Sequence, residues 1–144
     1  MLKNVDPLLT GSLLSALDRM EPGQWLTLTA GPIIMPAAAG SPVIDLTAAS
    51  TEVVVTALFS VLPLDVSEAP IVYLDTAPAS GDLPDVVFAV CGLASDAERR
   101  PVPMSRLDDE DFARLAAQSV LTVRSSCVGD PAAFLLRKGA PAAR

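Results

Sequence analysis

The sequence predicts an α/β fold, with one domain built on a mainly parallel sheet that has helices on both faces. Its length of 144 residues fits one domain. Segments whose apolar residues alternate as in strands are followed along the chain by segments with helical periodicity. The run Ile71–Asp75 is continuously apolar, as is typical of a strand buried on both sides. We expect the domain to span residues 1–144, with a loosely held tail beyond about residue 139.

The first quarter of the chain predicts a helix, a strand and a loop. Thr10 can cap the helix, whose apolar residues recur at helical spacing: Leu13, Leu14, Leu17 and Met20. Pro22 and Gly23 stop this helix. Gln24–Thr29 alternates in the manner of a strand, and the Gly and Pro content of residues 30–42 predicts a loop.

The middle of the chain predicts a short strand at Val43–Leu46 and a helix at Ala49–Leu62 that Pro63 ends. Leu83–Ala94 fits a helix by the spacing of its apolar residues. Its β-branched content also fits a strand, so both interpretations stay open. Val102–Met104 is a further strand candidate.

The last third predicts one helix and two strands. Asp108 opens the helix, and its inner face carries Phe112, Leu115, Ala116 and Ser119. Acidic residues occupy the first turn, where the helix dipole favours them. We expect strands at Val120–Arg124 and Ala133–Arg137, joined through a turn at Gly129–Pro131.

Composition excludes several functional classes. The net charge is −7 and the basic residues are scattered, which argues against binding nucleic acid. The opening residues lack the pattern of a signal peptide. The charge-free stretch 23–44 contains too many Gly and Pro residues to be a membrane-spanning helix. We therefore predict a cytoplasmic protein without membrane contact. The hydrophobic content of 51% indicates either surface buried between subunits or an unusually large core.

The residues available for chemistry are few. There is no histidine, the side chain best suited to proton transfer near neutral pH. Cys91 and Cys127 form no metal-ligand pattern and are expected to be reduced thiols, so we predict neither a metal nor a cofactor. Cys127 and the adjacent Ser125 and Ser126 lack a base to activate them.

Two groups of carboxylates are candidates for acid–base chemistry. For Asp108–Asp111 we favour a solvated helix start over a paired acid–base site. Asp45 lies in a short apolar strand, where it either marks a site or occupies the strand's exposed end; both interpretations stay open. The residues by themselves thus show no catalytic apparatus.

Three stretches of the sequence resemble the L-fucose mutarotase and D-ribose pyranase family (the RbsD/FucU fold). The opening MLKNVDPLLTGSLLSALDRM is similar to the family's MLK start, PLL or PLI element and first helix. Ser60–Asp65 resembles the end of a later helix, and Phe134–Gly139 resembles the closing ILLKKG-like strand. These motifs lie at the start, middle and end, so the resemblance covers nearly the whole chain.

The resemblance implies an enzyme that interconverts sugar anomers or ring forms by moving protons between the ring oxygen and the anomeric hydroxyl. It also implies ring-shaped homo-oligomers with small-molecule pockets between subunits. The family uses a histidine in a GHGD turn, an aspartate after the next strand, a basic or histidine position before the last helix, and a Tyr-x-Asn element before the final strand.

At these positions the chain departs from the family pattern. Pro22 stands in place of the histidine, with Gln24 at the end of the same turn, and Ala30 falls on or near the aspartate position. Met35 belongs to the segment that follows. The Tyr-x-Asn element becomes Pro131-Ala132-Ala133, and Arg106 alone keeps a counterpart.

Three hypotheses follow. In the first, a repurposed family member binds a sugar-like or less polar cyclic molecule between subunits and retains or has lost the ability to isomerise it. Its polar anchors would be Arg106, Gln24, Arg124 and Asp130. In the second, the chain is a non-catalytic oligomeric pseudoenzyme. In the third, the alignment is locally displaced and another group supplies mutarotation; the weak catalytic candidates are Asp45, Arg106 and Asp130.

Overall fold

One mixed sheet of six strands organises the computed structural model, which describes the chain except for residues 1–4, 67, 77–82, 128, 130 and 141–144. In sheet order the strands of this part are β2 (Val43–Ser50), β5 (Leu121–Ser126), β1 (Trp25–Ala30), β6 (Ala132–Arg137), β3 (Ile71–Leu74) and β4 (Met104–Leu107). Five of them run in one direction, and β6 runs antiparallel to both of its neighbours. The predicted mainly parallel sheet is confirmed.

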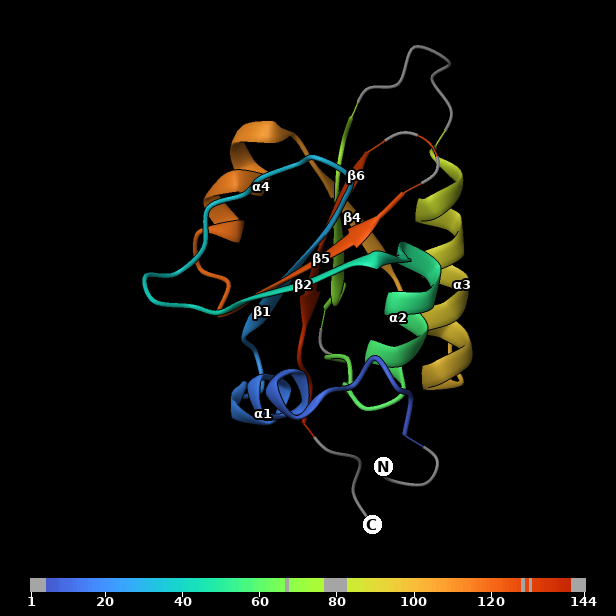
Figure 1. The fold of residues 1–144 in the computed structure, drawn as a ribbon. Helices are drawn as coiled ribbons and strands as arrows, with labels where there is room; N and C mark the ends of the chain where they lie inside the picture. Colours follow the sequence, from blue (N-terminus) through green and yellow to red (C-terminus); the bar gives the residue numbers. More distant parts are fainter. Residues whose placement is uncertain (1–4, 67, 77–82, 128, 130, 141–144) are drawn as a thin grey trace.

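The reversed direction of β6 follows from the short connection that leads into it. Only residues 127–131 separate β5 from β6, and the two strands lie on opposite sides of β1. A parallel strand would require a crossover of about a dozen residues or more. The chain therefore crosses the carboxyl end of β1 and returns antiparallel to it (Figure 1).

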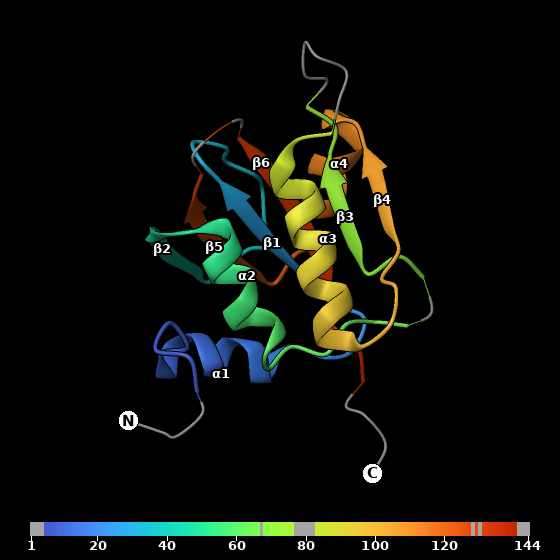
Figure 2. The same cartoon turned by 90° about the vertical axis from the view of Figure 1, so that its right-hand side faces the viewer.

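Helices cover both faces of the sheet, as predicted. Helices α1 (Gly11–Arg19), α2 (Thr51–Phe59) and α3 (Asp85–Glu98) pack on one face, and α4 (Asp109–Ala116) packs on the other (Figures 1 and 2). The larger core lies under the first three helices and includes Leu13, Val54 and Val90. The smaller core lies under α4 and includes Phe112 and Leu135.

Two of the predicted helix starts are confirmed by their caps. The Thr10 hydroxyl accepts a hydrogen bond from the Leu13 N–H at 3.3 Å, and the Asp108 carboxylate accepts one from the Asp111 N–H at 2.8 Å. Each cap gives one unpaired N–H of the first turn a partner. In α4 the predicted inner face is also confirmed, since Phe112 is fully buried.

The boundaries of two consecutive elements differ from the prediction. Strand β2 continues to Ser50, because its pairing with β5 shifts register between Asp45 and Ser50 and leaves an irregular segment that periodicity does not reveal. Helix α2 accordingly begins at Thr51, where the Ser50 hydroxyl caps it by accepting from the Val53 N–H at 3.4 Å. The helix ends at Phe59.

The segment that fits both helix and strand is a helix. Helix α3 buries Val87, Val90 and Ala94 along one side, so packing against α2 outweighs the β-branched content. The strand predicted at Val102–Met104 instead begins at Met104 as β4. Pro103 has no N–H to donate to a neighbouring strand, which explains why pairing starts only after it.

No helix in the part of the chain that the structure describes is long and apolar enough to cross a bilayer.

Candidate functional site

The carboxyl end of β1 gathers most of the residues that the family resemblance singled out. Ala30 lies opposite Ala132 of β6, and the preceding residue of β1 lies between Arg124 of β5 and Ala133 of β6. Pro131 leads into β6. We call Ala30, Arg124, Pro131, Ala132 and Ala133 the strand-end cluster.

The backbone beside this cluster is closely packed at Gly31. Gly31 adopts a positive φ of 85°, and its N–H donates to the Ser125 carbonyl at 3.2 Å. A Cβ at Gly31 would lie 3.0 Å from the Cys127 sulfur and 3.5 Å from Cβ of Pro131. Glycine is therefore required at the point where the connection from β5 to β6 passes over β1.

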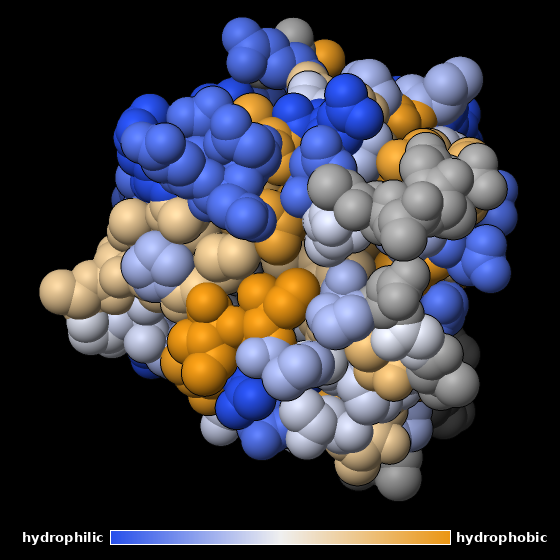
Figure 3. All heavy atoms as spheres, turned by 90° about the horizontal axis from the view of Figure 1, so that it is seen from above, coloured by the Kyte–Doolittle hydropathy of each residue, from blue (hydrophilic) through white to orange (hydrophobic). Residues whose placement is uncertain are grey.

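The members of the strand-end cluster differ in accessibility. Ala30, Ala132 and Ala133 are at most 3% exposed, because the chain's own two cores cover them. Pro131 is exposed and Arg124 is half-buried, while Met35 packs against the smaller core. From above, a compact apolar patch lies among hydrophilic side chains (Figure 3). A ligand approaching this end would meet Pro131 and Arg124 before the alanines.

Arg124 carries a positive charge that no described residue neutralises by direct contact, since none of them lies within hydrogen-bond or ion-pair distance of it. Its neighbour across the strand pair is Asp45 of β2. The exposed Asp45 accepts hydrogen bonds from the Thr47 hydroxyl at 2.7 Å and the Thr47 N–H at 2.9 Å. The guanidinium of Arg124 is thus available to a ligand.

The environment of Asp45 makes it a poor proton acceptor. The Thr47 hydroxyl first, then the Thr47 N–H, and to a lesser degree the charge of Arg124, hold the pKa of Asp45 below its ordinary value of 3.8. A general base works best with a pKa near the operating pH. Of the two interpretations of Asp45, the structure favours the exposed one, and the hypothesis that Asp45 supplies mutarotation loses physical support.

Sequence reasoning missed Thr29, the buried partner of Arg124 across the pair of β1 and β5. Thr29 is 1% exposed, and its hydroxyl oxygen is the one buried side-chain polar atom in the described residues that has no hydrogen-bond partner. Thr27, two residues earlier on the same face, donates to the Ser119 hydroxyl at 2.9 Å. The polar positions in the WLTLT alternation were the available signal for both.

Pro22 and Gln24 lie in a turn at the opposite end of β1. The Gln24 side-chain oxygen accepts from the Glu21 N–H at 2.8 Å. Gly23 donates its N–H to the Lys138 carbonyl at 2.7 Å. Both bonds fix the turn, and Pro22 is exposed at its tip.

A charged and aromatic group that the sequence did not reveal supports this turn. Arg137 donates from Nε to the Gly23 carbonyl at 3.2 Å and pairs with an Asp65 carboxylate oxygen at 3.3 Å. Its guanidinium lies 5.6 Å from the ring centroid of Trp25, within the range of a cation–π contact. Trp25 and Arg137 therefore lie at the same end of β1 as Pro22.

One chain does not bring the predicted site residues together. Strand β1 spans Trp25–Ala30, so its two ends are roughly 17 Å apart. Arg106 lies on the edge strand β4, with its Nε 3.7 Å from an Asp75 carboxylate oxygen. Asp130 lies outside the described residues.

The remaining nucleophiles and acids have structural contacts. The Ser125 hydroxyl donates to the Thr29 carbonyl and lies 2.8 Å from the Thr51 hydroxyl. The Cys127 thiol donates to the Gly129 carbonyl at 3.5 Å. Asp111 pairs with Arg114, which agrees with our interpretation of Asp108–Asp111 as a helix start. No three Cys, Asp or Glu residues in the described ranges are placed to hold a metal.

Comparison with known proteins finds similar solved structures. No protein-family model and no curated protein matches the sequence. Protein Atu2016, provisionally described as a sugar binding protein, superposes with a TM-score of 0.88 at 26% identity, over 99% of this chain and 97% of that one. FucU from Bifidobacterium longum gives a TM-score of 0.85 at 20% identity, over 97% of this chain and 100% of that chain.

The fucose mutarotase of Streptococcus pneumoniae, solved in complex with L-fucose, gives a TM-score of 0.76 at 17% identity and covers 98% of this chain and all of that one. The chain resembles the L-fucose mutarotase and D-ribose pyranase family. The sequence-based recognition of this RbsD/FucU-like fold is confirmed over nearly the full length of the chain.

Proposed function

We propose that the protein binds a sugar-like or less polar cyclic small molecule in a pocket between two subunits of a homo-oligomer. The pocket would form where the Pro22 turn of one copy meets the strand-end cluster of another. In this proposal the chain is a divergent relative of the sugar mutarotases that does not catalyse ordinary fucose or ribose mutarotation.

The observation that carries the proposal is the separation of the two halves of the site along β1. Pro22 and Gln24 lie at one end of this strand, and Arg124 and Pro131 lie at the other. One ligand of sugar size cannot touch both ends of a strand roughly 17 Å long. Two copies, arranged so that opposite ends face each other, remove this obstacle.

The side chains at these positions oppose ordinary mutarotation. That reaction needs one group to protonate the ring oxygen and another to accept the anomeric proton. Pro22 and Ala30 can do neither. Asp45, the carboxylate that pairs with Arg124 in the strand register, has a lowered pKa and stays ionised.

The polar groups that remain suit binding. Arg124 has a guanidinium without an ion-pair partner among the described residues, and its register partner on β1, Thr29, has an unpartnered hydroxyl. Gln24 and Arg106 offer further polar atoms at the other end of β1 and on the edge strand. An apolar pocket with a few polar groups is typical of small-molecule sites. Among the structures with the same fold, one holds L-fucose, which supports a ligand of the sugar class.

The alternative function is a non-catalytic subunit that only assembles. The burial of Ala30, Ala132 and Ala133 favours it, because the chain's own cores cover three positions expected to face a ligand. In this case the two ends of β1 meet across subunits without enclosing a molecule.

Ligand-observed NMR with fucose, ribose, galactose and their deoxy derivatives tests the proposal. We expect binding of the less polar members, no acceleration of anomer exchange in saturation-transfer spectra, and an oligomer by light scattering. Arg124→Gln should weaken binding roughly tenfold or more, since hydrogen bonds to a charged group contribute about 1.5–3 kcal/mol. Arg114→Gln, whose partners are the exposed Glu110 and Asp111, is the matched control.

Three results would overturn the proposal: a clear rate enhancement on free fucose or ribose, a monomer that binds ligand, and an Arg124→Gln variant with unchanged affinity. Assembly with no ligand bound at any concentration would establish the alternative function instead.

A further inference from the structure

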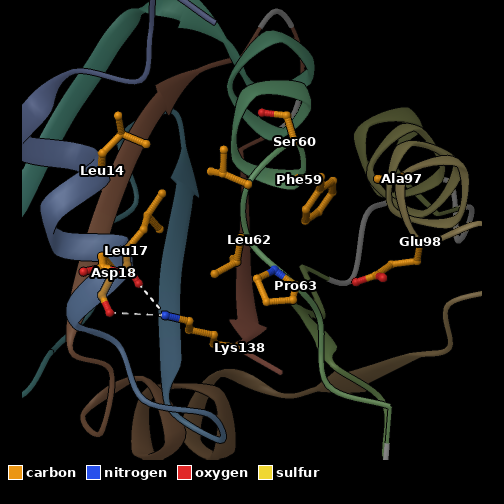
Figure 4. A pocket seen from close by; sticks show the side chains of 11 residues that line it. Leu14, Leu17, Asp18, Phe59, Ser60, Leu62, Pro63, Ala97, Glu98 and Lys138 are labelled. Carbon is orange, nitrogen blue, oxygen red and sulfur yellow. Dashed lines mark hydrogen bonds between the residues drawn. The ribbon is translucent and has the colours of Figure 1, made fainter. Parts of the chain in front are cut away.

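A hollow lies at the end of the molecule remote from the strand-end cluster. It encloses about 520 Å³ between the carboxyl-terminal ends of α1, α2 and α3 (Figure 4). Its walls are mainly apolar and include Leu14 and Leu17 of α1, Phe59 of α2 and the following Leu62 and Pro63. Its volume lies in the range of small-molecule pockets.

The hollow is lined by two carboxylates, Asp18 and Glu98, and by one cationic side chain, Lys138. Lys138 is the one lysine or arginine among its lining residues. Its ammonium donates to the carbonyls of Leu17 at 2.7 Å and Met20 at 2.6 Å, with the Asp18 carbonyl at 3.5 Å. Three protons and three acceptors match, so the ammonium of Lys138 completes the end of α1 and leaves no proton for a ligand.

Glu98 supplies a negative charge that lacks a cation. One oxygen of its carboxylate accepts from the Leu64 N–H at 2.6 Å, and no lysine or arginine in the described residues pairs with it. The carboxylate points across the hollow toward Pro63 (Figure 4). Asp18 adds a second carboxylate at the opposite wall.

The surrounding helices increase the negative potential. A helix carboxyl terminus carries the equivalent of about half a negative charge. Lys138 compensates that of α1, and Arg99 and Arg100 follow the end of α3, whereas the last turn of α2 has no basic residue. Residues 20–98 contain ten acidic residues and no lysine or arginine, and the two arginines that follow, Arg99 and Arg100, form no ion pair with Glu98 in the described residues.

We propose that this hollow binds a small organic cation, namely an alkyl- or arylammonium ion with an apolar body of about ten heavy atoms. The ammonium group hydrogen-bonds the free oxygen of Glu98, and the apolar body packs between Leu17, Phe59 and Leu62. The hollow shares no lining residue with the proposed sugar-like site, although the Pro22 turn lies at the same end of the sheet.

The probe is phenethylammonium, titrated into ¹⁵N-labelled protein and followed by amide chemical shifts, with phenethyl alcohol and phenylacetate as neutral and anionic isosteres. We expect the ammonium ion to bind roughly tenfold or more tightly than the alcohol, and phenylacetate to bind least, because the cation gains a charged hydrogen bond of about 1.5–3 kcal/mol. The shifts should centre on residues 59–63 and 97–98.

Glu98→Gln is the decisive variant, because glutamine keeps an acceptor for the Leu64 N–H and removes only the charge. It should bind phenethylammonium roughly tenfold more weakly with an unchanged thermal midpoint, whereas Glu110→Gln on α4 should bind as the wild type does. Leu14→Trp should fill the hollow and abolish binding.

Equal affinity for the amine and the alcohol, or an unchanged affinity of Glu98→Gln for the amine, would overturn the proposal. A dimer that Leu14→Trp dissociates and the amine leaves intact would identify a second copy as the occupant and would also overturn it.

Discussion

Thr27 and Thr29 form a matched pair for testing how hydroxyl groups stabilise β1. Both are 1% exposed, and both point to the face that α4 covers. They differ in that Thr27 donates a hydrogen bond to Ser119 at 2.9 Å, whereas the Thr29 hydroxyl has no partner among the described residues. We therefore predict that replacing each threonine by valine, which is nearly the same in shape, changes stability in opposite directions.

The magnitudes follow from the contacts. Thr27→Val loses one buried hydrogen bond, which contributes about 0.5–1.5 kcal/mol. The Ser119 hydroxyl keeps its own bond to the Ala116 carbonyl at 2.7 Å, so no donor is left unpaired and the loss should not exceed this range. Thr29→Val removes an unpartnered hydroxyl, whose burial costs about 1–3 kcal/mol. The two variants should differ by about 1.5–4.5 kcal/mol. For a chain of this length each kcal/mol shifts the thermal midpoint by about 2–4 °C.

Urea denaturation followed by the fluorescence of Trp25, together with thermal melting by circular dichroism, measures both variants. The oligomeric state must be the same in each, because subunit association shifts the midpoint. If Thr29→Val loses as much stability as Thr27→Val, the Thr29 hydroxyl has a partner and the reasoning is refuted. If it gains stability but loses ligand binding, Thr29 belongs to the ligand site.

Two further predictions concern a glycine pair and a carboxylate. Gly139→Ala should destabilise the protein by about 1–3 kcal/mol, because its Cβ would lie 2.6 Å from a backbone oxygen of Leu64; Gly92→Ala, in open space within α3, should stabilise it by about 0.5–1 kcal/mol in the same melts. Thr47→Val should raise the pKa of Asp45 toward 3.8 in a carboxyl ¹³C NMR titration, since it removes the hydroxyl bond that lowers this pKa most. In the wild type the stabilisation from Asp45 should be present above pH 3.8 and be lost as the pH falls through the lowered pKa; an unchanged titration in Thr47→Val would contradict this assignment.

Most elements of the fold could be predicted because their signals are local. Thr10 and Asp108 are residue types that cap helices, so they indicate where α1 and α4 begin. The Pro22–Gly23 pair indicates that the first helix has ended. The order of the strands and the reversal of β6 depend on pairing between distant segments. The periodicity of a single segment does not indicate which other strand it pairs with. The irregular stretch of β2 after Asp45 depends in the same way on its neighbour β5.

The candidate site was less predictable than the fold. The family resemblance indicated Pro22 and Arg124 without showing that they occupy opposite ends of β1. The uncommitted state of Arg124 and the unpartnered Thr29 hydroxyl are properties of three-dimensional contacts. A threonine in a strand looks the same in sequence whether its hydroxyl is bonded or not.

The strand order also determines when the chain can fold during its synthesis. Both neighbours of β1, which is the third strand in the sheet, are the last two strands to leave the ribosome, β5 and β6. The carbonyl groups at the end of α1 likewise gain their hydrogen bonds only after Lys138 has been synthesised, 121 residues after the Leu17 acceptor. Strand β1 therefore lacks both of its neighbours until residues 121–137 have been synthesised, and the sheet closes only then. Such delayed closure of non-local contacts slows folding and leaves nascent chains open to aggregation and to chaperones.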